Sequence, residues 1–138
     1  MRLVIDTNIV ISAFINPHGK PSQIMKMILG REAELCYNST ILSEYESVMH
    51  RPKFSGKIDS GNVRRFVDLL KSIGIPFNPL PYNASLHRAE KMPDESDRIF
   101  YDTARGSGSI LISGNLKHFP KEPFIMSPAD FLRQFEKG

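Results

Sequence analysis

The chain has very little cysteine and no long apolar run. Its one cysteine, Cys36, cannot form a disulfide within the chain, which excludes the small disulfide-stapled scaffolds of secreted proteins. No apolar run approaches the roughly 18 residues that a membrane-spanning helix requires. Asp6 and Asn8 interrupt the apolar N-terminal segment 1–15, which also lacks a small-residue cleavage site, so we expect no signal peptide. These absences together predict a cytoplasmic protein.

Charge of either sign is in no large excess. A formal net charge of +3 allows nucleic-acid binding but fits an ordinary, mildly basic surface equally well. The hydrophobic content of 41% and the charged content of 24% are those of a folded globular protein. The 138 residues contain no internal repeat or low-complexity tract, and we expect one domain over residues 1–138.

Short apolar segments alternate along the chain with segments of helical periodicity. Strands are expected at 2–5, 34–37, 75–77, 109–113 and 124–126. Helices are expected at 9–15, 22–29, from 39 or 40 up to Pro52, 62–73, 97–105 and from 127 onward. Thr7 or Asn8 is the expected N-cap of the first helix, and Ser22 that of the second. The alternation predicts an α/β fold with a mainly parallel central sheet flanked by helices.

Polar residues follow three of the predicted strands at their carboxyl ends. Asp6-Thr7-Asn8 follows the first strand, Asn38-Ser39-Thr40 the second, and Ser113-Gly114-Asn115 the strand at 109–113. A fourth polar segment, Asp94-Glu95-Ser96-Asp97, opens the helix that precedes this last strand. Because ligands of parallel α/β sheets bind at the carboxyl ends of the strands, we expect a functional site there.

Three acids stand out in these segments, and each has a simpler explanation when taken alone. Asp6 is placed to cap a helix, Glu44 to reach solvent from the edge of a buried helix face, and Asp97 to favour a helix dipole. If the three converge, however, their charges repel unless a cation or shared protons neutralise them. Oxygen ligands without nearby histidine or cysteine spacing favour Mg²⁺ or Mn²⁺ over Zn²⁺. Such a site suits hydrolysis of a phosphodiester by an activated water.

Four segments carry a resemblance to a known family. They are Val4-Ile5-Asp6-Thr7-Asn8, Ile41-Leu42-Ser43-Glu44-Tyr45, the run from Asp94 to Tyr101, and the run from Ile110 to Pro120. In this order and spacing the chain resembles the PIN-domain nucleases, and more closely a prokaryotic branch usually assigned as toxins of toxin–antitoxin pairs. The resemblance covers nearly the whole chain and implies a Rossmann-like PIN fold and a metal-dependent ribonuclease.

The resemblance also implies roles for individual residues. Asp6, Glu44 and Asp97 fall on three positions of an acidic quartet that binds the metal and carries catalysis. The fourth position, aspartate in many PIN proteins, is Asn115 here, which removes one charge from the metal-binding set and leaves open whether one ion or two would bind.

Supporting and RNA-binding residues complete the predicted site. Thr7, Asn8 and Ser113 are the expected supporting residues, although capping of the strand ends explains the two hydroxyls equally well. Lys117, His118 and Arg98 are candidate RNA contacts.

The leading functional prediction is an endoribonuclease that cleaves single-stranded RNA with Mg²⁺ or Mn²⁺ and is held in check by a cognate antitoxin protein. A homodimer is also expected, because Met25, Met27, Ile28 and Leu29 form a contiguous apolar set. One alternative is a PIN-fold module that binds nucleic acid or protein and in which Asn115 has weakened catalysis. A metal-dependent phosphatase also fits the carboxylates, but a second aspartate two residues after Asp6 is absent.

Overall fold

A computed structural model describes residues 1–79 and 92–136 of the chain. Its strands are β1 (Arg2–Ile5), β2 (Glu34–Tyr37), β3 (Ile75–Pro76), β4 (Ile110–Ile112) and β5 (Ile125–Met126). Its α-helices are α1 (Thr7–Ile15), α2 (Lys20–Leu29), α3 (Ser39–Met49), α4 (Ser60–Ile73), α6 (Arg98–Ser107) and α7 (Pro128–Glu136). Short 3₁₀ helices cover Pro52–Phe54, Glu95–Asp97 and Leu116–His118. The α/β prediction is therefore confirmed.

The strands form one parallel sheet in the order β3-β2-β1-β4-β5. From β1 the chain first builds outward through β2 and β3, and then returns to add β4 and β5 on the other side of β1. The connections leaving β1 and β4 therefore diverge. In open parallel sheets this point, between two neighbouring strands whose connections go opposite ways, is where ligands bind.

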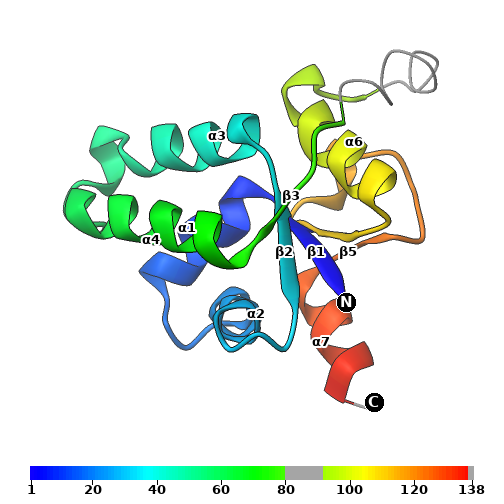
Figure 1. Cartoon of the computed structure of the whole chain (residues 1–138), viewed down its shortest axis with the longest axis horizontal. Coiled ribbons are helices and arrows are strands. Elements are labelled where there is room, and N and C mark those ends of the chain that lie inside the picture. The colour runs from blue at the N-terminus through cyan, green and yellow to red at the C-terminus, as the bar shows by residue number, and fades with distance from the viewer. Residues whose placement is uncertain (80–91, 137–138) are drawn as a thin grey trace.

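Helices cover both faces of the sheet. In Figure 1, α1, α3 and α4 lie to the left of the sheet, with α3 and α4 side by side, and α6 lies to its right. The helix α6 packs across β1, β2 and β4, while α2 contacts both α1 and α7. Both faces of the central strands are consequently buried, as the continuous apolar runs of a parallel sheet require.

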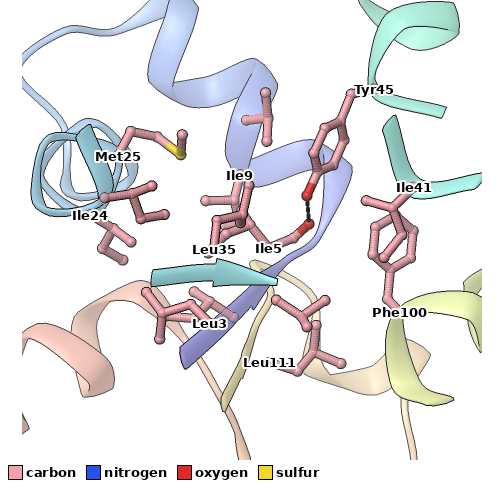
Figure 2. Packing of buried hydrophobic residues seen from close by; sticks show 14 of the residues in the cluster. Leu3, Ile5, Ile9, Ile24, Met25, Leu35, Ile41, Tyr45, Phe100 and Leu111 are labelled. Atoms are coloured by element: carbon pink, nitrogen blue, oxygen red, sulfur yellow. Dashed lines mark hydrogen bonds between the residues drawn. The ribbon is translucent and has the colours of Figure 1, made fainter. Parts of the chain in front are cut away.

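The core is built from the apolar faces of these helices and the sheet residues between them. Leu3, Ile5 and Leu111 of the sheet are fully buried, and Figure 2 shows them between the α1 and α3 side and the α6 side. Two aromatic rings, Tyr45 of α3 and Phe100 of α6, stack with their centroids 6.4 Å apart beside the sheet. This packing holds α3 and α6 against each other beside the sheet.

Helix starts differ from the sequence prediction by one to three residues. The N-cap of α1 is Asp6 rather than Thr7 or Asn8, and α2 begins at Lys20 with Gly19 as its N-cap rather than at Ser22. Pro21 is accommodated there because the first turn of a helix needs no hydrogen bond from it. Asp59 caps α4 by accepting a hydrogen bond from the backbone of Asn62, so this helix also starts before the predicted residue.

The apolar set expected to form a dimer interface is largely inside the molecule. Met25 and Ile28 belong to the hydrophobic core, and Met27 packs against it. Leu29 is exposed. The apolar face of α2 therefore packs against α1 and α7 instead of forming a surface patch. The reason for expecting a dimer through this face is wrong. Within the described residues, no helix has the length and apolarity needed to cross a membrane.

Candidate functional site

Asp6 and Ser113 meet where β1 and β4 end side by side. The backbone N–H of Asp6 donates to the carbonyl of Ile112, at 3.0 Å, which extends the β1–β4 pairing by one step. The Ser113 hydroxyl then donates to Asp6 Oδ2 at 2.7 Å. Both side chains are buried, and Asp6, although at the N-cap position of α1, makes no side-chain capping hydrogen bond. The capping explanation for Asp6 is therefore not what the geometry supports.

Glu44 reaches the same edge of the sheet from α3. Its carboxylate accepts a hydrogen bond from the Thr7 hydroxyl, in the first turn of α1. The neighbouring Tyr45 donates its hydroxyl to the carbonyl of Ile5, 2.5 Å away, as Figure 2 shows. These two contacts join α3 to the end of β1, so Glu44 is held next to the Asp6 segment rather than released to solvent.

Asp97 comes from the opposite side, at the junction between the 3₁₀ helix Glu95–Asp97 and α6. Its side chain is 16% exposed, and its Oδ2 is buried without a hydrogen-bond partner among the described residues. The Nδ1 atom of His118 lies 3.5 Å from this oxygen. Asp97 is therefore a half-buried carboxylate with one buried oxygen, and its charge is only partly compensated.

Asn115 lies at the start of the 3₁₀ helix that carries His118. Its backbone N–H donates to the Ser113 hydroxyl at 3.0 Å, and its side-chain Nδ2 lies 3.0 Å from His118 Nε2. Asn115 itself is exposed. A continuous series of contacts thus leads from Asp6 through Ser113, Asn115 and His118 to Asp97.

The electrostatics of the site show that its acids are close enough to affect one another. Burial raises the pKa of Asp6 above the ordinary value, although the hydrogen bond from Ser113 opposes this effect. Burial and then the charge of Asp6, with smaller effects of Asp94 and Glu44, raise the pKa of Asp97 to about 6. Burial, Asp6 and Glu44 likewise raise the pKa of Tyr45. For Asp97 and Tyr45 the second cause, after burial, is the charge of Asp6, which indicates an excess of negative charge at this edge of the sheet.

This charge excess and the orphaned Asp97 oxygen fit a hard divalent cation. The donors that face the edge are carboxylates, with an amide beside them and no cysteine, which suits Mg²⁺ or Mn²⁺. Within residues 1–79 and 92–136, however, no three His, Cys, Asp or Glu side chains are close enough to form a metal site as they stand. The acids lie within electrostatic reach of one another without forming a closed ligand set.

Other predicted residues lie at the margin of the site. Asn8 is exposed on α1. Arg98 forms an ion pair with Glu95, with its Nε 2.6 Å from Oε2, and its Nη1 lies 4.0 Å from Asp102. Asp102 is fully buried in α6. Lys117 is exposed and lines a hollow of about 440 Å³ with Leu116 and Phe119.

Two residues that position the site were given no role from the sequence. Tyr45 was named only within a segment that resembles the family, and Asn38 only as a polar residue at the end of the second predicted strand. A buried tyrosine hydroxyl needs a partner, and that need was the available signal for Tyr45. Asn38 caps α3 by accepting from the backbone of Ile41, and its Nδ2 donates to the Phe77 carbonyl at 3.2 Å and to Thr103 Oγ1 at 2.9 Å. These long-range partners are invisible in the sequence.

Comparison with known proteins places this geometry in a family. The chain is similar to an uncharacterized protein of Methanocaldococcus jannaschii, with 29% identity over an alignment of length 152. The alignment covers 99% of this chain and 93% of that protein. Its fold is similar to a crystal structure of VapBC2 from Rickettsia felis bound to a DNA fragment from their promoter. That match has a TM-score of 0.57 and 18% identity, and covers 92% of this chain and 97% of the other. A profile of the PIN domain matches residues 2–117, and this span includes every acid described above, so the chain belongs to the PIN-domain family.

Proposed function

We propose that this protein is a divalent-metal-dependent endoribonuclease that cleaves single-stranded RNA. The observation that carries the proposal is the gathering of Asp6, Glu44 and Asp97, from three separate elements, at the point where the connections leaving β1 and β4 diverge. Membership of the PIN-domain family supports a nuclease as the reaction class. The raised pKa of Asp97 supports a cation as the missing partner of these acids.

The ion would be held by Asp6, Glu44, Asp97 and Asn115. It would lower the pKa of a water molecule and neutralise charge on the phosphate. The chain's own residues prepare this site. Thr7 orients the Glu44 carboxylate and Ser113 orients Asp6, so that both acids present oxygens to the same edge of the sheet. Arg98 and Lys117 are proposed to contact the RNA backbone, and the apolar hollow beside Lys117 would accept a neighbouring base.

We further propose that a cognate antitoxin protein binds and inhibits the enzyme. The fold neighbour from Rickettsia felis is a VapBC2 assembly, and the sequence resembles PIN proteins assigned as toxins. Co-expression with the product of a small adjacent reading frame, followed by size-exclusion chromatography with light scattering, tests this partner. The same measurement on the chain alone tests the homodimer, for which α2 no longer supplies a surface.

The decisive experiment is cleavage of end-labelled RNA with Mn²⁺, Mg²⁺ or EDTA. We expect cleavage with either ion and none with EDTA. Asp6→Asn, Glu44→Gln and Asp97→Asn should each lower the rate at least about 100-fold while the fold is retained, because no other group replaces the lost ligand. Asp68→Asn, at an exposed acid on α4, is the matched control and should cleave like the wild type.

A second candidate is a PIN-fold binding module without catalysis. It is favoured by the neutral Asn115, which stands where many PIN proteins carry the fourth acid. Intact RNA with both ions, together with retained RNA binding, would support this candidate and contradict the nuclease. Cleavage that persists in EDTA, or in all three carboxylate variants, would point to a contaminating enzyme and also count against the proposal.

A further inference from the structure

His118 bridges the two positions of the site that are hardest to explain, Asn115 and Asp97. Its Nε2 lies 3.0 Å from the Asn115 amide nitrogen, and its Nδ1 lies 3.5 Å from Asp97 Oδ2. The imidazole is roughly half exposed, whereas the carboxylate oxygen it faces is buried and has no hydrogen-bond partner within the described residues. His118 is thus the group best placed to compensate that oxygen.

The chemistry of the two neighbours selects one form of the neutral ring. A carboxylate oxygen can only accept, so Nδ1 must carry the proton that faces Asp97. An amide NH₂ can only donate, so Nε2 must present its lone pair to Asn115. Both demands are met by the same tautomer, with hydrogen on Nδ1, and neither is met by the tautomer with hydrogen on Nε2.

We infer that Asn115 locks His118 in the Nδ1–H tautomer and that His118 thereby holds the Asp97 carboxylate in place. His118 is then a positioning residue that acts through Asp97, rather than a contact to RNA. Asn115 in turn is half of an Asn–His pair, which gives the neutral residue at this position a role of its own. The catalytic consequence rests on the proposed nuclease function, whereas the tautomer does not.

The tautomer is measured by long-range ¹H–¹⁵N correlation NMR on the ¹⁵N-labelled full chain without metal, at about pH 8.5, well above the ordinary histidine pKa of about 6.5. We expect His118 to show a protonated Nδ1 and an unprotonated Nε2. The exposed His18 and His50 should show the Nε2–H tautomer that free neutral imidazole prefers. In Asn115→Ala only Asp97 still favours hydrogen on Nδ1, so we expect a smaller share of the Nδ1–H tautomer. Removing both neighbours, in Asn115→Ala combined with Asp97→Ala, should return His118 to that free-solution preference. Nε2–H at His118 in the wild type would overturn the inference whether or not the protein cleaves RNA.

Two conservative variants separate positioning from RNA contact. In His118→Asn the amide nitrogen replaces Nδ1–H, whereas in His118→Gln the amide replaces only the Nε2 end of the ring. A hydrogen-bonding neighbour that orients a metal ligand is typically worth about 10–100-fold in activity or metal affinity. We therefore expect His118→Gln to lose about 10–100-fold in kcat and in Mn²⁺ affinity measured by calorimetry, and His118→Asn to recover most of both.

The matched control is His18→Gln, the same change at an exposed histidine outside the site. Equal losses in His118→Asn and His118→Gln, confined to KM, would overturn the positioning role in favour of an RNA contact. A wild type that shows the predicted tautomer but cleaves no RNA would contradict the proposed function alone, and leave the Asn–His pair intact.

Discussion

Two hydroxyl side chains, Thr7 and Ser113, each hold one of the acids at the candidate site. Within residues 1–79 and 92–136, neither acid forms an ion pair with a lysine or arginine, so hydrogen bonds fix their orientation. A hydroxyl orients a carboxylate without neutralising it, which leaves the negative charge available to a cation. At the scale of single residues, the two carboxylates are therefore held in a defined orientation while their negative charge is not neutralised.

Asp97 makes the stability of the metal-free protein depend on pH. Its pKa rises from the ordinary 3.8 to about 6 in the folded chain. Between these values the folded chain binds a proton that the unfolded chain has released, so the free energy of unfolding falls as the pH rises from about 4 to about 6. Asp97→Asn should remove much of this slope and, at neutral pH without metal, stabilise the protein by on the order of 1 kcal/mol.

Urea unfolding of both proteins across this pH range, in EDTA, measures the effect. The raised pKa of Asp6 leaves part of the slope in the variant, so the comparison is between slopes rather than with zero. A wild type and variant with the same pH dependence would contradict the electrostatic account of Asp97.

At the scale of elements, most of the site lies at the ends of strands and helices. Asp6 directly follows β1, Ser113 directly follows β4 and Asp97 lies at the start of α6, whereas Glu44 lies in the middle of α3. The positions of these ends depend on how closely neighbouring connections pack. One connection that packs closely contains Gly74, between α4 and β3, which lies against β2.

Gly74→Ala tests the connection that supports β2. A Cβ at this position would lie 2.7 Å from Tyr37 Cδ1, 2.8 Å from the Leu70 carbonyl oxygen and 3.0 Å from the Leu35 carbonyl oxygen. Two of these atoms are backbone and cannot give way cheaply, so we expect a loss of about 2–3 kcal/mol in the free energy of unfolding. Thermal and urea unfolding measure the loss.

Gly56→Ala is the matched control for Gly74→Ala. A Cβ at Gly56 meets nothing within 4 Å, and this residue has no positive φ. We expect the free energy of unfolding of the Gly56→Ala protein to stay within about 0.5 kcal/mol of the wild-type value. A Gly74→Ala protein as stable as the Gly56→Ala protein would show that the connection is looser than the structure describes.

At the scale of the whole molecule, the strand order decides which acids meet. Because β4 returns to pair with β1, residues 6 and 113, more than a hundred positions apart, are joined by a 2.7 Å hydrogen bond. The acids therefore repel one another in the native state, whereas in the unfolded chain they are far apart. A divalent ion that binds this native arrangement must stabilise the whole molecule.

Binding of Mn²⁺ should accordingly reverse the stability order of wild type and Asp97→Asn. Without metal the variant is expected to be the more stable, as argued above. At a free Mn²⁺ concentration about 100 times its dissociation constant, linkage adds about 2.7 kcal/mol to the wild type and much less to the variant. Differential scanning calorimetry with and without Mn²⁺ measures both. A melting temperature that Mn²⁺ raises equally in the two proteins would place its binding site elsewhere.

The sequence by itself determined the class of fold and the candidate acids. Short apolar runs and period-3.6 patterns are local, so β1, β2 and α3 were predicted within about two residues. Asp6, Glu44, Asp97 and Asn115 were identified because their order and spacing match a family pattern, and the PIN-domain match confirms that family. Helix starts were less accurate, because side-chain and backbone caps compete over one turn.

Only the tertiary structure decided how these residues are used. The apolar residues of α2 could be assigned to the core rather than to a surface only once α1 and α7 were seen to cover them. Tyr45, Asn38 and His118 take partners from 21 to 65 residues away. Such contacts depend on strand order and helix packing, which are properties of the assembled sheet and leave no trace in local periodicity.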